Sequence, residues 1–119
     1  YGLDMYRIYA RSRIVLNRHL HAAENYANNC RLYEATGMGA LLVTEMKDNL
    51  PDLFDPEKEV VTYRSADEAV QKIKYYLDHE SERAAIAKAG QERTLREHTY
   101  YHRMQELWQI IANEMKGRW

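Results

Sequence analysis

The sequence of 119 residues has little of several residue types that define protein classes. Cys30 is the only cysteine, so an internal disulfide and a cysteine-based zinc framework are excluded. A single thiol is what we expect of a chain in the reducing cytoplasm. No apolar run approaches the length of a membrane span, and no signal-peptide pattern is visible. We therefore expect a globular chain without a membrane span.

An excess of charge of one sign is also missing. The chain has 17 Lys and Arg against 18 Asp and Glu, a formal net charge of −1. No basic field therefore points to nucleic acid or to an anionic membrane as a partner. The length fits one domain over residues 1–119, or part of one. Because the chain starts at Tyr1 without a methionine, we expect a piece of a longer protein.

Hydrophobic periodicity predicts helices alternating with strands, an α/β layer fold around a short parallel sheet. A capping box at Ser65-Ala66-Asp67-Glu68 and a threonine cap at Thr99 mark two of the helix starts. The expected helices cover residues 3–13, 29–38, 65–79, 81–98 and 99 onward, and the expected strands cover 14–16, 40–44 and 59–63. The segment 18–29 is expected to be a loop with a short helix at 21–26. The segment 45–52 is expected to be a loop or a short turn of helix that ends at Pro51.

The last three helices are expected to bury apolar stripes. Ser81 is the predicted cap of the middle one, and Gly90 is a predicted kink in it. The stripes comprise Ala69, Val70, Ile73, Tyr76 and Leu77 in the first, Ala84, Ala85, Ile86 and Ala89 in the second, and Tyr101, Met104, Leu107, Trp108, Ile111 and Met115 in the third. Three strands make a narrow sheet, so we expect preceding sequence or self-association through the sheet or the C-terminal helix to complete it.

The stretch from Asn28 to Glu45 carries the main candidate site. Asn28 and Asn29 lie at a predicted helix start, where free N–H groups and the helix dipole attract anions. Arg31 and Glu34 are three residues apart and share one helix face. Phosphate could lie on the N–H groups and Arg31, while Glu34 accepts hydrogen bonds from ribose hydroxyls. The alternative is a surface ion pair between Arg31 and Glu34. Gly37 or Gly39 is expected to close this helix in the left-handed conformation.

Other residues in the sequence could also take part in chemistry. His19, His21 and Glu24 could ligate a metal, but nothing else in the sequence completes the shell, and a histidine that touches phosphate or sugar fits better. Cys30 at a helix start is either a nucleophile or a small buried residue. Arg103 is interpreted as the structural partner of Glu106.

The order of several motifs resembles the C-terminal half of GT-B glycosyltransferases, and most closely the CgeB-like spore-maturation subgroup. The matching residues are Asn17, Asn29-x-Arg31-x-x-Glu34-Ala35, Gly39-Ala40-Leu41-Leu42-Val43-Thr44-Glu45, Leu50-Pro51-Asp52-Leu53-Phe54, Glu59-Val60-Val61-Thr62-Tyr63, Tyr75-Tyr76-Leu77 and His98-Thr99-Tyr100-x-x-Arg103. The likeness covers nearly the whole chain from about Gly2.

This resemblance implies a Rossmann-like half of a GT-B fold that binds a nucleotide-diphosphate sugar as the donor substrate, with no cofactor or metal. It implies retaining glycosyl transfer to an unknown acceptor held by an N-terminal half, toward which the last helix crosses. The donor-binding residues it implies are Asn17, Asn28, Asn29, Arg31 and Glu34, and the catalytic residues stay unknown. We add His21 to this set as the histidine expected to contact phosphate or sugar. A second glutamate that relatives often carry is replaced here by Tyr26. The rival hypothesis is a non-catalytic α/β module of an assembly or spore coat.

Overall fold

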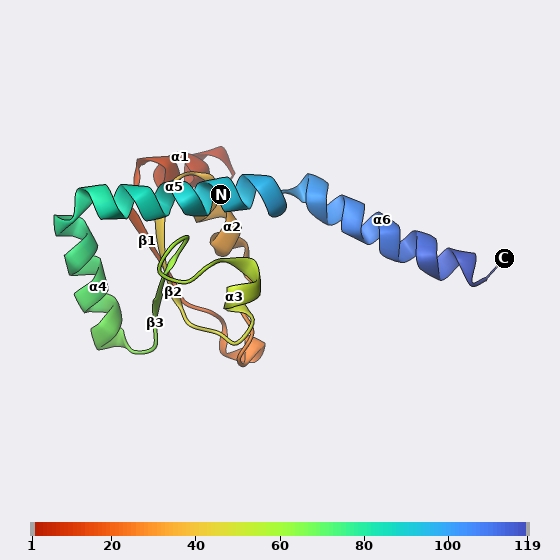
Figure 1. The fold of residues 1–119 in the computed structure, drawn as a ribbon, viewed down its shortest axis with the longest axis horizontal. Coiled ribbons are helices and arrows are strands. Elements are labelled where there is room, and N and C mark those ends of the chain that lie inside the picture. Colours follow the sequence, from red (N-terminus) through yellow and green to blue (C-terminus); the bar gives the residue numbers. More distant parts are fainter. Residues whose placement is uncertain (1, 119) are drawn as a thin grey trace.

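A three-stranded parallel sheet lies between two layers of helices in the computed structural model, which describes residues 2–118 (Figure 1). The strands β1 (Ile14–Asn17), β2 (Leu41–Glu45) and β3 (Val61–Tyr63) lie side by side in chain order. Ile14 pairs with Leu41, and Val43 pairs with Val61. The expected α/β fold with a short parallel sheet and a helical C-terminus is therefore confirmed.

Residues 2–118 also form six α-helices and one 3₁₀ helix. They are α1 (Leu3–Arg11), η1 (His21–Ala23), α2 (Cys30–Gly37), α3 (Leu50–Leu53), α4 (Ala66–Asp78), α5 (Glu80–Glu97) and α6 (Tyr100–Lys116). Gly39, with a φ of 83°, takes the left-handed conformation just after α2. The predicted alternative of a short helical turn before Leu53 is confirmed by α3. Pro51 lies in the first turn of α3 and not at its end, because a proline fits where no helical N–H is needed.

The apolar sequence of β2 follows from burial on both faces of the sheet. Leu42 belongs to a core with Leu32 of α2 and Phe54, which follows α3. Leu41 and Val43 point the other way, into a core with residues of α4 and α5. Alternate residues of a strand face opposite sides, so a strand between two helical layers needs apolar residues at every position. The two layers also place the carboxyl ends of the three strands at one edge.

Helix α5 buries a different face from the one predicted. Its buried residues are Arg83, Ala87, Gly90 and Thr94, at helical spacing. Thr94 is accommodated because its hydroxyl lies 2.6 Å from that of Thr36 on α2, and Arg83 donates to the backbone oxygen of Arg13. Ala84 and Ala85 are exposed instead. The prediction assumed that polar residues of α5 face solvent. Polar groups that have hydrogen-bond partners can be buried instead.

The ends and stripes of the neighbouring helices show smaller differences. The N-cap of α5 is His79, so Ser81 lies inside the helix and is not its cap. Ser65 caps α4 as predicted, by accepting from the backbone N–H of Glu68. Val70 and Leu77 of α4 are 49% and 38% exposed, so they lie outside the core stripe predicted for that helix.

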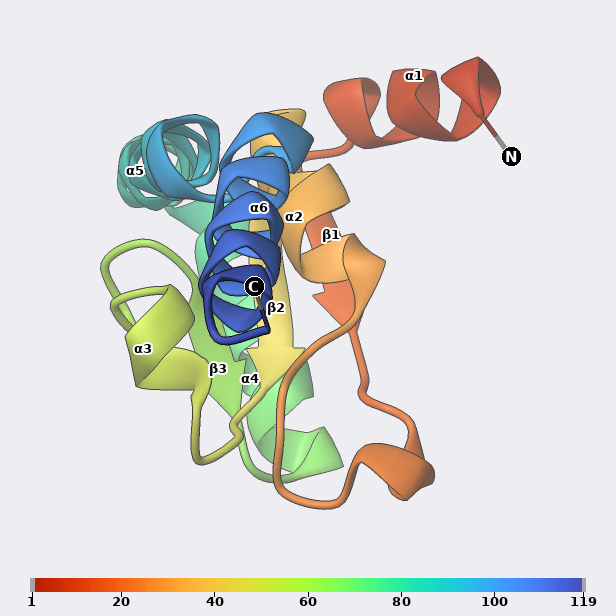
Figure 2. The ribbon, with the colours of Figure 1, turned by 90° about the vertical axis from the view of Figure 1, so that its right-hand side faces the viewer.

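Helix α6 extends away from the rest of the molecule in Figure 1 and is seen end-on in Figure 2, and the molecule has dimensions of 60 × 29 × 26 Å. Its predicted start is confirmed: Thr99 and His102 form a capping box. Its predicted role in the core is wrong, because none of its residues is buried within the part of the chain that the structure describes. The exposed apolar stripe of α6 comprises Tyr101, Met104, Leu107, Trp108, Ile111 and Met115. No helix among residues 2–118 is both long and apolar enough to cross a membrane.

Gly90 marks a close approach between α5 and the chain before β3, and α5 runs through it as one helix. A Cβ atom there would overlap the backbone oxygen of Glu59. We expect Gly90→Ala to lower the free energy of unfolding by about 1–3 kcal/mol, although alanine normally favours a helix. Urea unfolding measures this. Gly37→Ala is the matched control, because its added Cβ would lie 3.5 Å from Thr94, an ordinary contact. Equal stability of Gly90→Ala and wild type would contradict the close approach.

Candidate functional site

A partly buried amide pair, Asn17 and Asn29, joins the end of β1 to the start of α2. The side-chain amide of Asn17 donates to Oδ1 of Asn29 over 3.2 Å, and that of Asn29 donates to Oδ1 of Asn17 over 2.9 Å. The Asn17 amide also donates to the hydroxyl of Thr44 on β2, over 3.0 Å. Asn17 is fully buried, and a buried amide is stable only when its donors and acceptors are paired. The loop between Asn17 and Asn29 is therefore fixed at both ends.

Three further polar side chains extend this network along the carboxyl edge of the sheet. His19 is buried, and its Nε2 lies 3.3 Å from the Thr44 hydroxyl. The backbone N–H of His19 donates to the carboxylate of Glu45 over 3.4 Å. The Tyr63 hydroxyl donates to the backbone oxygen of Asn17 over 2.8 Å. All three strands thus contribute polar groups at the edge where open parallel sheets bind ligands.

Burial sets the protonation states in this network. Desolvation lowers the pKa of His19, against the opposing effect of Glu45, so the ring is held neutral. Burial raises the pKa of Tyr63, and the Glu45 carboxylate adds to the effect. The Thr44 hydroxyl accepts from Asn17 and can therefore donate to Nε2 of neutral His19. The edge is polar but carries few full charges.

The first turn of α2 is not capped by a side chain. Asn29 occupies the N-cap position with extended backbone angles, but its side chain makes no capping hydrogen bond. That side chain is committed to Asn17 instead. The N–H groups at the start of α2 therefore stay available on the positive end of the helix dipole.

A cavity of about 630 Å³ opens beside this helix start. Asn28, Asn29 and Glu34 line it from the α2 side, and Thr99 and Arg103 line it where α5 meets α6. Three tyrosine rings complete the wall, and these are Tyr6, Tyr33 and Tyr100. Burial raises the pKa of Tyr6, and the Glu34 carboxylate adds to the rise. The cavity thus combines aromatic surface with one carboxylate and one guanidinium.

The predicted site residues are only partly brought together. Asn28, Asn29 and Glu34 share the cavity, and Asn17 contacts it through Asn29. His21 is exposed in η1, and Arg31 is exposed on α2; neither lines this cavity. No ion pair joins Arg31 to Glu34 within residues 2–118, so the surface-pair alternative does not describe this structure.

The structure also places Cys30, Arg103 and the residues considered as metal ligands. Cys30 is exposed and lines the cavity, so its prediction as a small buried residue is wrong. Arg103 pairs with Glu106 over 3.0 Å, as predicted. Residues 2–118 contain no cluster of three or more possible metal ligands; His19 faces Thr44, and Glu24 is exposed. Sequence reasoning missed Thr44 and Tyr63, whose only signal is their position at strand ends.

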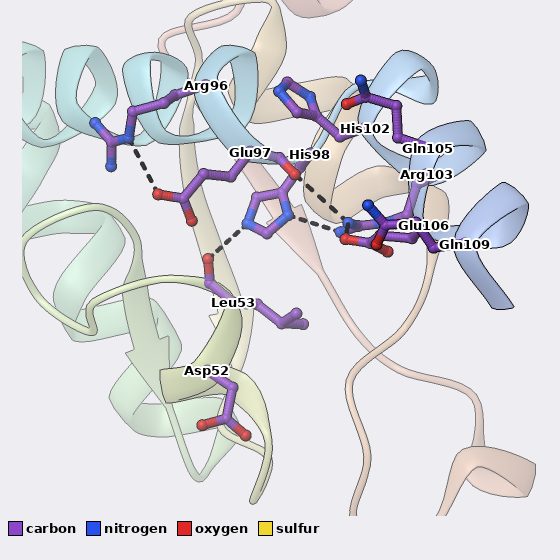
Figure 3. Close-up of a pocket in the computed structure, with 10 residues that line it drawn as sticks. All are labelled: Asp52, Leu53, Arg96, Glu97, His98, His102, Arg103, Gln105, Glu106 and Gln109. Atoms are coloured by element: carbon purple, nitrogen blue, oxygen red, sulfur yellow. Dashed lines mark hydrogen bonds and ion pairs between the residues drawn. The ribbon is translucent and has the colours of Figure 1, made fainter. Parts of the chain in front are cut away.

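A second cavity of about 520 Å³ lies on the other side of the α5–α6 corner (Figure 3). Asp52 and Leu53 of α3 form its floor, and His98 and Arg103 line both cavities. The corner therefore borders one cavity that has three tyrosine rings and another that has five charged side chains.

Comparison with known families agrees with this geometry. A family model described as glycosyl transferase-like matches residues 1–109. The chain belongs to this glycosyl transferase-like family. Membership supports a general role in glycosyl transfer, and the match includes the whole sheet and most of α6. A search of curated proteins gives no match.

Loss of the Asn17 amide is expected to destabilise this family member. Asn17→Ala leaves the Asn29 amide and the Thr44 hydroxyl without their buried partner, so we expect a loss of about 2–4 kcal/mol in the free energy of unfolding. Chemical denaturation measures it. Asn28→Ala, at an exposed neighbouring asparagine, should change stability by less than about 0.5 kcal/mol. Comparable losses in the two variants would contradict the role of the amide pair.

His19 is expected to make stability depend on pH. Its pKa is lower in the folded chain than the ordinary value of about 6.5. Between these two values the unfolded chain binds more protons, so the free energy of unfolding falls as the pH drops below about 6.5. His19→Gln should weaken this dependence of stability on pH. Part of the dependence should remain in the variant, because the pKa of His98 is also lowered. Urea titrations at several pH values test this, and identical slopes for variant and wild type would count against a buried neutral His19.

Proposed function

We propose that the chain is the donor-binding, C-terminal half of a GT-B glycosyltransferase of the CgeB-like subgroup. It would bind a nucleotide-diphosphate sugar and support transfer of the sugar to an acceptor. The observation that carries the proposal is the cavity in which the Glu34 carboxylate lies beside the uncapped start of α2. Family membership supplies the reaction class.

Glu34 is suited to hold the ribose of the donor. Among residues 2–118 its carboxylate has no ion pair or hydrogen bond, so both oxygens can accept from the two ribose hydroxyls. Tyr6 and Tyr33 offer rings beside it, and aromatic rings provide flat apolar surface for a nucleotide base. The cavity volume of about 630 Å³ falls in the range of small-molecule sites.

The start of α2 is suited to the diphosphate. In glycosyl transfer the bond between the sugar carbon and the phosphate oxygen breaks, and negative charge grows on the departing diphosphate. N–H groups of Cys30 and Arg31 on the positive helix end would stabilise that charge without moving. The Arg31 side chain lies outside the cavity and would act from its rim. We assign no catalytic residue within the chain.

The apolar stripe of α6 is the surface we assign to contact with an acceptor-binding N-terminal half. We further propose a cytoplasmic enzyme without a resident cofactor, since its donor carries its own activating group.

The rival function, a non-catalytic assembly module, is favoured by the same exposed stripe, which could pair copies of the chain instead. Light scattering across a concentration series would reveal such pairing.

Titration with nucleotides tests the donor site. UDP, GDP and ADP are added to ¹⁵N-labelled protein, and amide shifts are followed by NMR. We expect one nucleotide to shift the signals of Asn29, Cys30 and Glu34. Glu34→Gln should weaken that binding by about ten-fold or more, because charged hydrogen bonds to the ribose are lost.

Glu92→Gln is the matched control, because Glu92 is an exposed glutamate on α5 that does not line the cavity. It should leave the affinity unchanged. Shifts that cluster away from α2, or no shift at millimolar concentrations of any nucleotide, would count against the proposal.

A further inference from the structure

One histidine connects α6 to the rest of the molecule. His98 is the C-cap of α5, and its Nε2 lies 2.8 Å from the backbone oxygen of Leu53. Its Nδ1 lies 2.7 Å from a guanidinium nitrogen of Arg103, in the first turn of α6 (Figure 3). The rings of Tyr33 and Phe54 lie 5.1 and 5.2 Å from the His98 ring. The imidazole is therefore fixed by α2, α3 and the residue after α3, and α6 is attached to it.

These contacts specify one protonation state of His98. A carbonyl oxygen only accepts hydrogen bonds, so Nε2 must carry a proton. A guanidinium only donates, so Nδ1 must be bare. Neutral imidazole with its proton on Nε2 satisfies both partners. A second proton on Nδ1 would remove the acceptor for Arg103 and would place two cations in contact.

The charges around His98 oppose a second proton. Arg103 faces it from α6, and Arg93 and Glu97 face it from α5. Beyond Arg103 lies Glu106, and the sides formed by α2, Leu53 and Phe54 add only rings and a carbonyl. Burial lowers the pKa of His98, and the two guanidinium groups add to this against the Leu53 oxygen and Glu97.

Few other contacts fix the direction of α6. None of its residues is buried in the part of the chain that the structure describes. Arg103 also reaches the backbone oxygen of Glu97 over 3.4 Å and lies above the Tyr33 ring at 5.8 Å. Arg103 is thus the side chain through which α6 engages α2 and α5, and His98 holds it in place.

We propose that His98 is a pH-sensitive latch that fixes the direction of α6 while neutral and releases it when protonated. Release changes the direction of the helix and not its folding, since the capping box of Thr99 and His102 starts α6 independently. Because His98 and Arg103 line both cavities, the latch also couples the direction of α6 to the shape of each cavity.

Spin-label distances test the latch in the full chain. Labels are placed at the exposed positions Lys88 on α5 and Asn113 on α6, as Lys88→Cys and Asn113→Cys in a Cys30→Ser background. Double electron–electron resonance then gives the distribution of distances between them. We expect a single narrow maximum at about pH 7.5 and its loss to a broad distribution at about pH 5, well below the ordinary histidine pKa of about 6.5. The same distribution at both pH values would overturn the proposal.

Three variants separate His98 from other titrating groups. Arg103→Gln should give the broad distribution already at about pH 7.5. His98→Gln should remove the difference between the two pH values. His102→Gln should retain that difference, because glutamine also suits the third position of a capping box. A pH response that survives in His98→Gln, or that disappears in His102→Gln, would assign it to another group and overturn the latch.

A direct measurement covers the case in which a His98 variant fails to fold. Far-UV circular dichroism identifies such a failure, and the unmodified protein then serves. NMR of its imidazole nitrogens should show His98 with a proton on Nε2 and none on Nδ1 at neutral pH. A proton on Nδ1 under those conditions would overturn the proposal.

Discussion

Burial of β2 on both faces is the constraint on which the rest of the structure depends. A central parallel strand has no solvent-facing side, so Leu41, Leu42 and Val43 each need a covering layer. One layer is supplied by α2 and α3, and the other by α4 and α5. The long helix α5 packs on the sheet through Ala87, and Gly90 lets it lie close to the backbone just before β3. The packing of the sheet between these two helical layers then fixes where each connecting loop begins.

The polar edge follows from that same constraint. Parallel strands end together, and each must satisfy its last polar groups away from the apolar layers. Asn17 does so by pairing with Asn29 and Thr44, and this pairing draws the Asn29 side chain away from the helix end that it would otherwise cap. The stability of the edge and the proposed diphosphate site at the start of α2 thus depend on the same side-chain pairing. Separate residues are not needed for the two purposes.

The sequence predicted those elements whose burial pattern is local. The strands, the α2 start at Asn29, the closing glycine and the capped starts of α4 and α6 all carry short-range signals, and the structure has them. The buried face of α5 could not be predicted, because Arg83 and Thr94 are buried through partners distant in sequence, such as Arg13 and Thr36. The grouping of Glu34 with Arg103 was hidden for the same reason. It depends on a corner between two helices that no spacing rule describes.

Helix α6 differs from β2 because its apolar face is exposed among residues 2–118. A helix of 17 residues is long enough to form when it is capped. Most helical stability in proteins nevertheless comes from packing an apolar face, and the stripe containing Met104, Trp108 and Ile111 packs on nothing in residues 2–118. What the described residues supply is a start, through Thr99 and His102, and a direction, through His98 and Arg103. The conformation of α6 is therefore determined by a few polar contacts at one end, which makes its orientation the part of the fold most sensitive to charge.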